Sequence, residues 1–324
     1  MGRIDGKRAS YIDPMMQLMP HIMPRRYDAC NTTKVTCFSK PIEDFIADQK
    51  AKGEIFSFND VFLASLVRLY SKREALNRFV IARKIYDRYT FSISFVIKKG
   101  LRDAGEETVV KVEFDGSETL YEVRDKIKQV VESNLRSTDV NSLDIFMDKL
   151  VRMPSGLLAV VAGFLKWLDK VGLWGKGLMN MLPFHTSCFV TFMKSIKGNY
   201  IYHHIYDFGT ASMFLALGKE QMIPVVKEGE IKSEKTFTIG AVMDERFCDG
   251  LYYVNSVRMW EKMLNDPSVL LEPGEKKFTK KLVLERRKKL MKEKKQKMAD
   301  KKRLIKQNKK ELKAQRKQKK LSQN

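Results

Sequence analysis

Apolar and polar positions alternate along several short stretches of the chain, which is the pattern of β-strands with one buried face. From Tyr89 to Lys98, the apolar residues Phe91, Ile93, Phe95 and Ile97 alternate with mostly polar neighbours. The β-branched run Thr32–Ser39 predicts another strand. The remaining predicted strands are Asn77–Tyr86, Thr108–Phe114, Cys188–Ile196, Ala211–Leu217, Ile223–Lys227 and Glu234–Met243.

Between these stretches, apolar residues recur every three or four positions, as on a helix with one buried face. The segment after Ser57 carries Val61, Leu66 and Leu69 at that spacing. Further helices are predicted at Ile42–Ala51, Leu120–Leu135 and Gly250–Asn265. Residues 1–31 contain three prolines and are predicted to be irregular. Strands interleaved with helices predict an α/β (α+β) domain with a mixed sheet.

Residues 142–183 form a segment of different composition, rich in Leu, Phe, Trp and Met with helical spacing. We interpret it as an apolar helical insert that packs on the sheet as a hairpin. Two other interpretations remain open, namely a cover over a ligand channel and a membrane-facing patch. The longest apolar run, Gly156–Leu165, has about half of the roughly 20 residues that a bilayer-spanning helix needs.

The net charge of +22 comes almost entirely from the C-terminal segment. Residues 275–324 hold 23 of the 61 Lys and Arg residues and 5 of the 39 Asp and Glu residues. The rest of the chain is therefore close to neutral, and its charge does not indicate nucleic-acid binding. We divide the chain into a globular domain at 1–274 and a basic helical tail at 275–324.

The tail lacks Pro and Gly from Lys281 to Leu321 and is rich in good helix formers. A narrow apolar stripe recurs every seven residues at Leu284, Met291, Met298, Ile305 and Leu312. Lys and Arg occupy most of the complementary positions, which argues against a coiled coil. A solvated helix, RNA or another polyanion, and an anionic membrane surface all stay open for this tail. Phe278 is the one aromatic residue of the tail, so any nucleic-acid binding is expected to be non-specific.

The four cysteines, Cys30, Cys37, Cys188 and Cys248, form neither a disulfide framework nor a zinc motif. No metal is expected. The N-terminal residues lack the apolar stretch of a secretory signal. Together these features predict a reducing, cytoplasmic location.

The segment Asp244-Glu-Arg-Phe-Cys-Asp-Gly250 is the most informative motif of the chain. It follows a predicted strand and precedes the helix 250–265, after which the chain reads Asp266-Pro-Ser-Val-Leu-Leu271. This arrangement resembles the catalytic domain of the acyltransferase component of 2-oxo acid dehydrogenase complexes. That family has the chloramphenicol acetyltransferase-like fold, and its motif is D-H-R-x-x-D-G. Asp244, Arg246, Asp249 and Gly250 match the motif, whereas Glu245 stands where the family has its catalytic histidine.

Other segments follow in the order expected from this resemblance. Glu74-Ala-Leu-Asn77 is similar to the family's P-x-L-N segment, and the strand 89–99 and the helix 119–135 come after it. Phe208–Gly218 resembles the strand that precedes the last hairpin. The resemblance covers roughly 32–274, and the family's lipoyl domain and linker are absent from this sequence.

The resemblance implies thiol acyl transfer with coenzyme A. In the family, a histidine takes the proton of a thiol, the thiolate attacks a thioester, and a hydroxyl group donates to the oxyanion. The subunits are trimers with active sites between neighbours, so a homotrimer and an acyl-CoA or acyl thioester substrate are implied here. Thr191 takes the position of the oxyanion hydroxyl. Asp249 and Arg246 are implied to be structural residues that hold the turn through a charge pair.

Glu245 determines what chemistry this motif supports. An ordinary Glu has a pKa of about 4.3, against about 6.5 for His and about 8.5 for a thiol. The exchange therefore costs roughly 3 kcal/mol of driving force for proton transfer. Burial of Glu245 would offset this cost. The acyltransferase activity is predicted to be altered or lost, with Glu245 or a nearby histidine as the base. Of the four histidines His21, His185, His203 and His204, the pair 203–204 is the best placed substitute.

The alternative function is a non-catalytic trimeric scaffold that keeps the fold and uses its basic tail to bind RNA, another polyanion or an anionic membrane. A Glu245 that faces a channel near Thr191 of a neighbouring subunit favours the enzyme. A Glu245 locked in an ion pair favours the scaffold.

Overall fold

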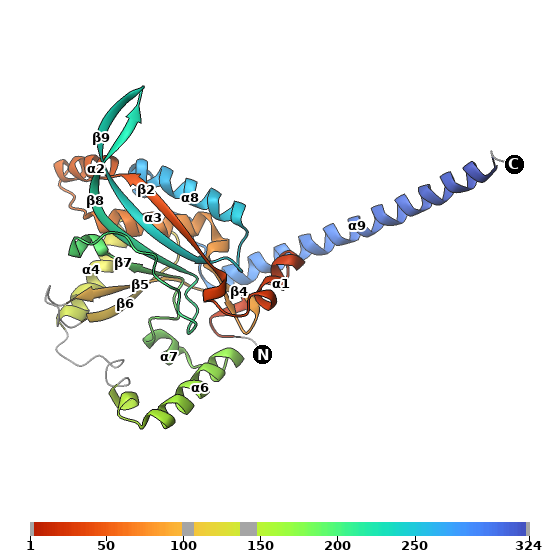
Figure 1. The fold of residues 1–324 in the computed structure, drawn as a ribbon, viewed down its shortest axis with the longest axis horizontal. Coiled ribbons are helices and arrows are strands. Elements are labelled where there is room, and N and C mark those ends of the chain that lie inside the picture. Colours follow the sequence, from red (N-terminus) through yellow and green to blue (C-terminus); the bar gives the residue numbers. More distant parts are fainter. Residues whose placement is uncertain (1–2, 99–106, 137–147, 322–324) are drawn as a thin grey trace.

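A mixed six-stranded sheet forms the centre of the protein in the computed structural model, which describes residues 3–98, 107–136 and 148–321 (Figure 1). β7 runs parallel to both β5 and β8, and the other neighbours are antiparallel. The predicted mixed sheet is therefore confirmed. The order across the sheet is β2 (Cys30–Phe38), β9 (Glu230–Asp244), β8 (Met213–Lys227), β7 (Cys188–Thr191), β5 (Phe91–Lys98) and β6 (Glu107–Phe114).

A second, three-stranded sheet corrects the prediction of a single strand at Asn77–Tyr86. It consists of β1 (Gly6–Arg8), β4 (Lys84–Arg88) and β3 (Arg78–Ile81), with β4 in the middle. Ala82 and Arg83 make the turn between β3 and β4 with φ angles of 47° and 59°. Tight hairpins usually place Asn-Gly or Asp-Gly at these two positions, so the sequence gives no sign of this turn.

Helices α2 (Lys40–Ala51), α3 (Phe58–Lys72), α8 (Gly250–Asn265) and α4 (Leu120–Arg136) pack together over the large sheet (Figure 1). α3 begins with a capping box between Ser57 and Asp60 and is buried from Val61 to Ser71. It lies in the middle of the main core, where the indole N–H of Trp260 donates to the hydroxyl of Ser65 at 2.7 Å. The helices predicted in these regions are thus confirmed.

The N-terminal 31 residues are more regular than predicted. They include β1 and α1 (Pro14–Ile22), in which Pro14 occupies the first turn and Asp13 accepts a hydrogen bond from the backbone N–H of Met15. Proline suits that position because the first N–H groups of a helix have no partner within the helix. Single-turn 3-10 helices occur at η1 (Tyr27–Ala29), η2 (Glu74–Asn77), η3 (Met193–Ile196) and η4 (Pro267–Leu270).

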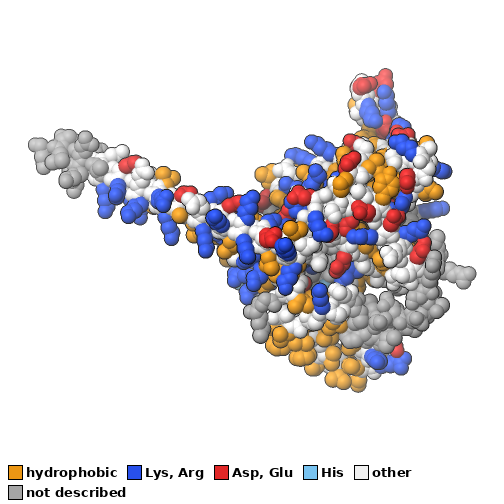
Figure 2. Space-filling model, turned by 180° about the vertical axis from the view of Figure 1, so that it is seen from behind, with side chains coloured by type: hydrophobic (Ala, Val, Ile, Leu, Met, Phe, Trp, Pro, Cys, Tyr) orange, Lys and Arg blue, Asp and Glu red, His pale blue; other side chains and the backbone are white. Residues whose placement is uncertain are grey.

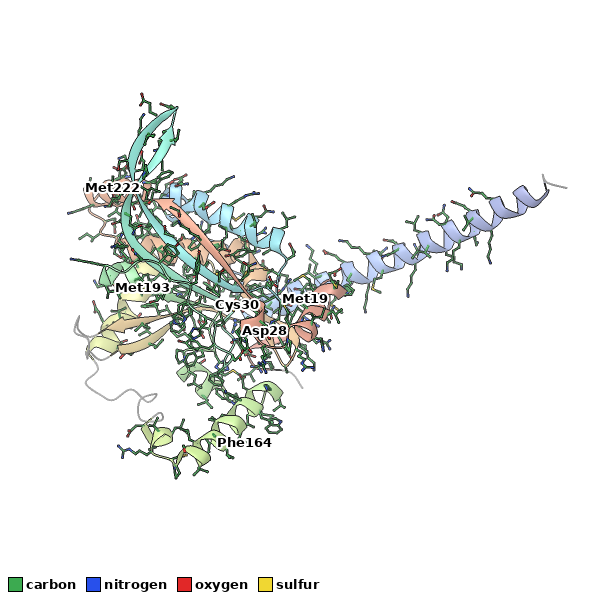
Figure 3. The ribbon with its side chains drawn as sticks, viewed as in Figure 1. Met19, Asp28, Cys30, Phe164, Met193 and Met222 are labelled. Atoms are coloured by element: carbon green, nitrogen blue, oxygen red, sulfur yellow. The ribbon has the colours of Figure 1, made fainter. Side chains whose placement is uncertain are left out.

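β8 and β9 are longer than the strands predicted from alternation. They form one hairpin whose outer half extends beyond the sheet, with Met222 near the point where it leaves the body (Figure 3). Met222, Val226 and Ile231 in this outer half are 61%, 73% and 78% exposed. The predicted strands Ala211–Leu217 and Ile223–Lys227 are parts of one continuous strand, β8, and the predicted strand Glu234–Met243 begins earlier, at Glu230.

The apolar insert predicted at 142–183 contains α6 (Ser155–Val171) and α7 (Lys176–Met181), and its first residues lie outside the described part. Trp174, Met179 and Leu182 form a small core with Leu165 and Leu168 on the inner side of α6. The outer side of α6 is an exposed apolar surface at the edge of the molecule (Figure 2). This surface is made by Leu157, Val160, Phe164 and Trp167, which are 51% to 68% exposed. No helix in the described residues has the length and apolarity needed to cross a membrane.

The basic tail is a single helix, α9 (Lys280–Leu321), which projects away from the body (Figure 1). Its beginning is nevertheless part of the body, because Phe278 and Val283 are buried, at 3% and 0% exposure. Further along, the ammonium group of Lys294 donates to the carbonyl oxygens of Ser10 and Ile12, both at 3.0 Å. The segment 275–324 defined by its charge therefore has a docked part, up to Lys294, and a projecting part.

Candidate functional site

The segment 244–250 lies at a strand–turn–helix junction. β9 ends at Asp244, and α8 begins at Gly250. Asp249 caps α8, because its carboxylate accepts a hydrogen bond from the backbone N–H of Tyr252 at 2.8 Å. This pairing satisfies one of the free N–H groups at the helix start. The side chain of Asp249 is exposed and forms no ion pair with Arg246.

Arg246 pairs with Asp244 instead of Asp249. Its Nε and Nη2 atoms donate to the two carboxylate oxygens of Asp244 at 2.8 and 2.7 Å, and both side chains are buried. A third bond, from Arg246 Nη1 to the carbonyl oxygen of Met23 at 2.9 Å, ties the turn to the N-terminal segment. A bidentate buried pair of this kind fixes the turn in one geometry.

A second buried arginine, Arg26, lies beside this pair. Its Nε atom is 3.8 Å from Oδ2 of Asp244. Its Nη atoms donate to the carbonyl oxygens of Tyr206, Val80 and Gly209. Burial lowers the pKa of Arg26, and the nearby Arg246 acts in the same direction, while Asp244 opposes them. One carboxylate thus lies between two guanidinium groups in the interior.

Glu245 is exposed at the start of the turn. Its backbone N–H donates to the carbonyl oxygen of Ala29 at 2.9 Å, which places it beside Cys30, the partner of Asp244 in the β2–β9 ladder. Figure 3 shows Cys30 near the middle of the molecule, where this end of the sheet meets the N-terminal segment. Within the described residues, the Glu245 carboxylate forms no hydrogen bond or ion pair. It is therefore available to another molecule.

Thr191, the second predicted site residue, lies at the end of β7 and is half-buried. Thr191 is paired with Ala216, and Ala216 is paired with Gly240 on β9. Glu245 follows five residues further along. Neighbouring strands lie about 4.8 Å apart, and the chain rises about 3.3 Å per residue along a strand. The Cα atoms of Thr191 and Glu245 are therefore about 19 Å apart. One chain therefore does not bring Glu245 and Thr191 together.

His203 lies near the motif, whereas the contacts of His185 do not place it there. His203 stacks on Phe214 with ring centroids 4.0 Å apart, and Phe214 is paired with Val242, three residues before Glu245. His203 thus lies at the same end of the sheet as the motif. His185 is buried and bonded to the carboxylate of Asp169 at 3.1 Å, a pair that the sequence did not indicate.

The described residues contain no cluster of three or more His, Cys, Asp or Glu side chains placed to hold a metal ion. The thiols of Cys37, Cys188 and Cys248 are buried, and burial raises the pKa of each to about 12. These three cysteines are therefore packing residues, as expected for thiols without a charged partner.

Several solved structures are similar to this chain in fold. A chloramphenicol acetyltransferase superimposes with a TM-score of 0.50 over 80% of this chain and 99% of its own, at 10% identity. A probable dihydrolipoamide acetyltransferase from Listeria monocytogenes matches with a TM-score of 0.49 over 78% and 92%, at 11% identity. A truncated catalytic core of the 2-oxoacid dehydrogenase multienzyme complex from Thermoplasma acidophilum gives 0.49 over 79% and 97%, at 12% identity. Neither the protein-family models nor the curated proteins give a match.

The chain thus has the chloramphenicol acetyltransferase-like fold, and the fold predicted from its motif is confirmed. At such low identity the likeness establishes the fold alone. The roles of Glu245, Thr191, Arg246 and Asp249 remain predictions.

Proposed function

We propose that the protein is a coenzyme-A-dependent acyltransferase that moves an acyl group between thiols, with Glu245 in the position of the base. The observation that carries the proposal is the Asp244–Arg246 pair, which holds Glu245 at a strand–turn–helix junction of an acyltransferase fold. The exposed and unpaired carboxylate of Glu245 supports this proposal over the scaffold alternative, for which an ion-paired Glu245 was expected.

In this reaction, the Glu245 carboxylate takes the proton from the attacking thiol as its sulfur bonds to the thioester carbonyl carbon. The tetrahedral oxyanion then collapses, the original C–S bond breaks, and the leaving thiolate takes the proton from the Glu245 carboxyl group, which regenerates the base. A carboxylate is a weaker base than imidazole, so we expect a slow enzyme. About two pKa units separate Glu from His, and with partial proton transfer in the transition state this costs about tenfold in rate.

Glu245 and Thr191 belong to one site only if two copies of the chain assemble. Because about 19 Å separates them within one chain, the Thr191 hydroxyl that donates to the oxyanion must come from a neighbouring subunit. We therefore include a homotrimer in the proposal, with its sites between subunits. Sedimentation of the full chain at micromolar concentration tests this, and a monomer would contradict it.

The experiment that tests the function measures acyl exchange between acetyl-CoA and dihydrolipoamide or another small thiol. Glu245→Gln keeps the size of the side chain and removes the base, so the exchange should fall to background. Glu245→His should raise the rate about tenfold and introduce an inflection near pH 6.5, the ordinary pKa of imidazole. If Glu245→Gln has the wild-type rate, Glu245 is not the base.

A further inference from the structure

A cavity of about 290 Å³ opens between the N-terminal segment, the β3–β4 turn, helix α6 and the loop 207–209. Arg246 reaches its wall, whereas Glu245, Thr191 and Asp249 do not contribute to it. The walls are strongly cationic, with only two acidic residues, Asp169 and Asp207. The basic residues in the lining are Arg25, Arg26, Arg83, Lys166, Lys170 and Arg246.

Both acidic residues already have partners. Asp169 binds the guanidinium group of Arg3 at 2.9 Å and the ring of His185 at 3.1 Å. Burial raises the pKa of Asp169, but these partners outweigh it and lower the pKa overall, so the carboxylate is ionised and already paired. Asp207 accepts a hydrogen bond from the backbone N–H of Arg26 at 3.1 Å. Neither carboxylate therefore pairs with Arg83, Lys166 or Lys170, the three cations at the mouth of the cavity.

The three cations at the mouth, by contrast, lack ionic partners in the described part of the chain. Arg83, Lys166 and Lys170 form no ion pair or hydrogen bond there, and all three side chains are exposed at the mouth. Lys166 and Lys170 are one turn apart on α6, so they present their charges together. At the inner end, Arg26 is 5% exposed, and its buried Nε–H forms no hydrogen bond, while it lies 3.8 Å from Oδ2 of Asp244. A buried donor without an acceptor is uncommon and costly.

The turn that carries Arg83 is held in an unfavourable conformation. Ala82 and Arg83 both adopt left-handed φ angles, 47° and 59°, without the glycine that normally relieves this strain. The strained turn places Arg83 at the cavity, opposite the lysines of the apolar insert. Strain of this kind is typical of functional sites.

We propose that this cavity binds a small organic phosphate, held by Lys166, Lys170 and Arg83 at the mouth. A phosphate group offers several acceptor oxygens and two negative charges, which match a fork of guanidinium donors and a cluster of ammonium groups. The apolar insert has a part in this site, because α6 supplies two of the cations. The proposal does not depend on the acyltransferase activity.

The test is a calorimetric titration of the full-length protein with inorganic pyrophosphate at low ionic strength. The double variant Lys166→Gln/Lys170→Gln removes two charges from the mouth and should weaken binding about tenfold, because each lost charge contributes a modest attraction near the surface. The matched control is Lys149→Gln/Lys176→Gln, which removes two exposed charges of the same insert that do not line the cavity. The control should keep the wild-type affinity.

A second variant separates binding from folding. Arg83→Gly relieves the left-handed strain and removes the charge, so the melting temperature should stay the same or rise while pyrophosphate affinity falls. Repeating the titration with coenzyme A in saturating pyrophosphate identifies the source of the phosphate. Competition assigns the cavity to the diphosphate of coenzyme A, and independent binding assigns it to another phosphate ester. No binding of pyrophosphate, or an equal loss in both double variants, would overturn the proposal, because the attraction would then come from the basic chain as a whole.

Discussion

At the scale of single residues, Asp244 is the residue that holds the motif turn in place. It accepts both hydrogen bonds of the Arg246 fork and lies 3.8 Å from Arg26. Removing the charge of one partner in a buried cluster leaves the others uncompensated, which costs about 3–5 kcal/mol. Asp249 serves only as an N-cap, a role worth about 1 kcal/mol.

These two acidic residues therefore predict a clear order of stability. Asp244→Asn should lower the free energy of unfolding by about 3 kcal/mol or more, and Asp249→Ala by about 1 kcal/mol. Urea denaturation followed by circular dichroism measures both. Equal losses, or a greater loss for Asp249→Ala, would show that the turn is held by the pair expected from the sequence and not by Asp244–Arg246.

The stability of the protein is predicted to depend on pH through Lys111 on β6. Burial lowers its pKa to about 8, and its ammonium group donates to the carbonyl oxygen of Met179 at 2.8 Å. Because the folded-state pKa lies below the unfolded one, the unfolded chain binds more protons between about pH 8 and 10.5, and stability rises with pH there. Below that window the buried charge costs up to about 3 kcal/mol.

Lys111→Met should therefore raise the melting temperature at pH 7, and the gain should shrink as the pH approaches 10. Lys128→Met on α4 is a surface control that should show no such trend, because Lys128 is exposed. A gain in Lys111→Met that does not depend on pH would mean that packing, and not charge, is responsible.

At the scale of elements, the clearest periodic patterns along the chain predict the correct structures. The alternation at Phe91–Ile97 gave β5, and the spacing after Ser57 gave α3, because each buries one continuous face. The β3–β4 hairpin was missed because Ala82 and Arg83 carry no turn signal. The helix at Pro14 was missed because proline breaks a helix interior but suits its first turn.

The sequence could predict the motif turn but not its surroundings. The motif located the strand–turn–helix junction, but the charge pair expected between Asp249 and Arg246 is formed by Asp244 and Arg246. The pairing of Asp169 with His185 and Arg3, and the cationic cavity, join residues that are far apart along the chain. Periodicity reports local structure and cannot indicate such contacts.

The tail provides a prediction at this scale. Because Phe278 and Val283 are buried and Lys294 is bonded to the N-terminal segment, a chain that ends after Lys294 should keep the melting temperature of the full protein. A chain that ends at Gly274 should lose several kcal/mol, since each buried apolar side chain contributes about 1.5–3 kcal/mol. Thermal denaturation of the two truncated chains compares them directly. The same melting temperature for both would contradict the docked position of residues 275–294.

At the scale of the whole molecule, most of the net positive charge lies on the tail, which projects away from the folded body. The projecting part of α9 holds 13 Lys and Arg residues against 2 Asp and Glu residues from Lys295 onward. Counterion release favours the binding of polyanions to such a helix, so we predict salt-dependent binding to heparin. The chain that ends after Lys294 should therefore elute from heparin at a much lower salt concentration than the full protein. Equal elution would place the heparin-binding charges in the body.

The central claim is that Glu245 and Thr191 act together across a subunit boundary, and mixing two inactive variants tests it most directly. Glu245→Gln and Thr191→Ala should each abolish acyl exchange alone. When the two are refolded together in equal amounts, about a quarter of the inter-subunit sites receive both wild-type residues, so about a quarter of the wild-type activity should return. Activity that stays at the level of the single variants would contradict a site shared between subunits.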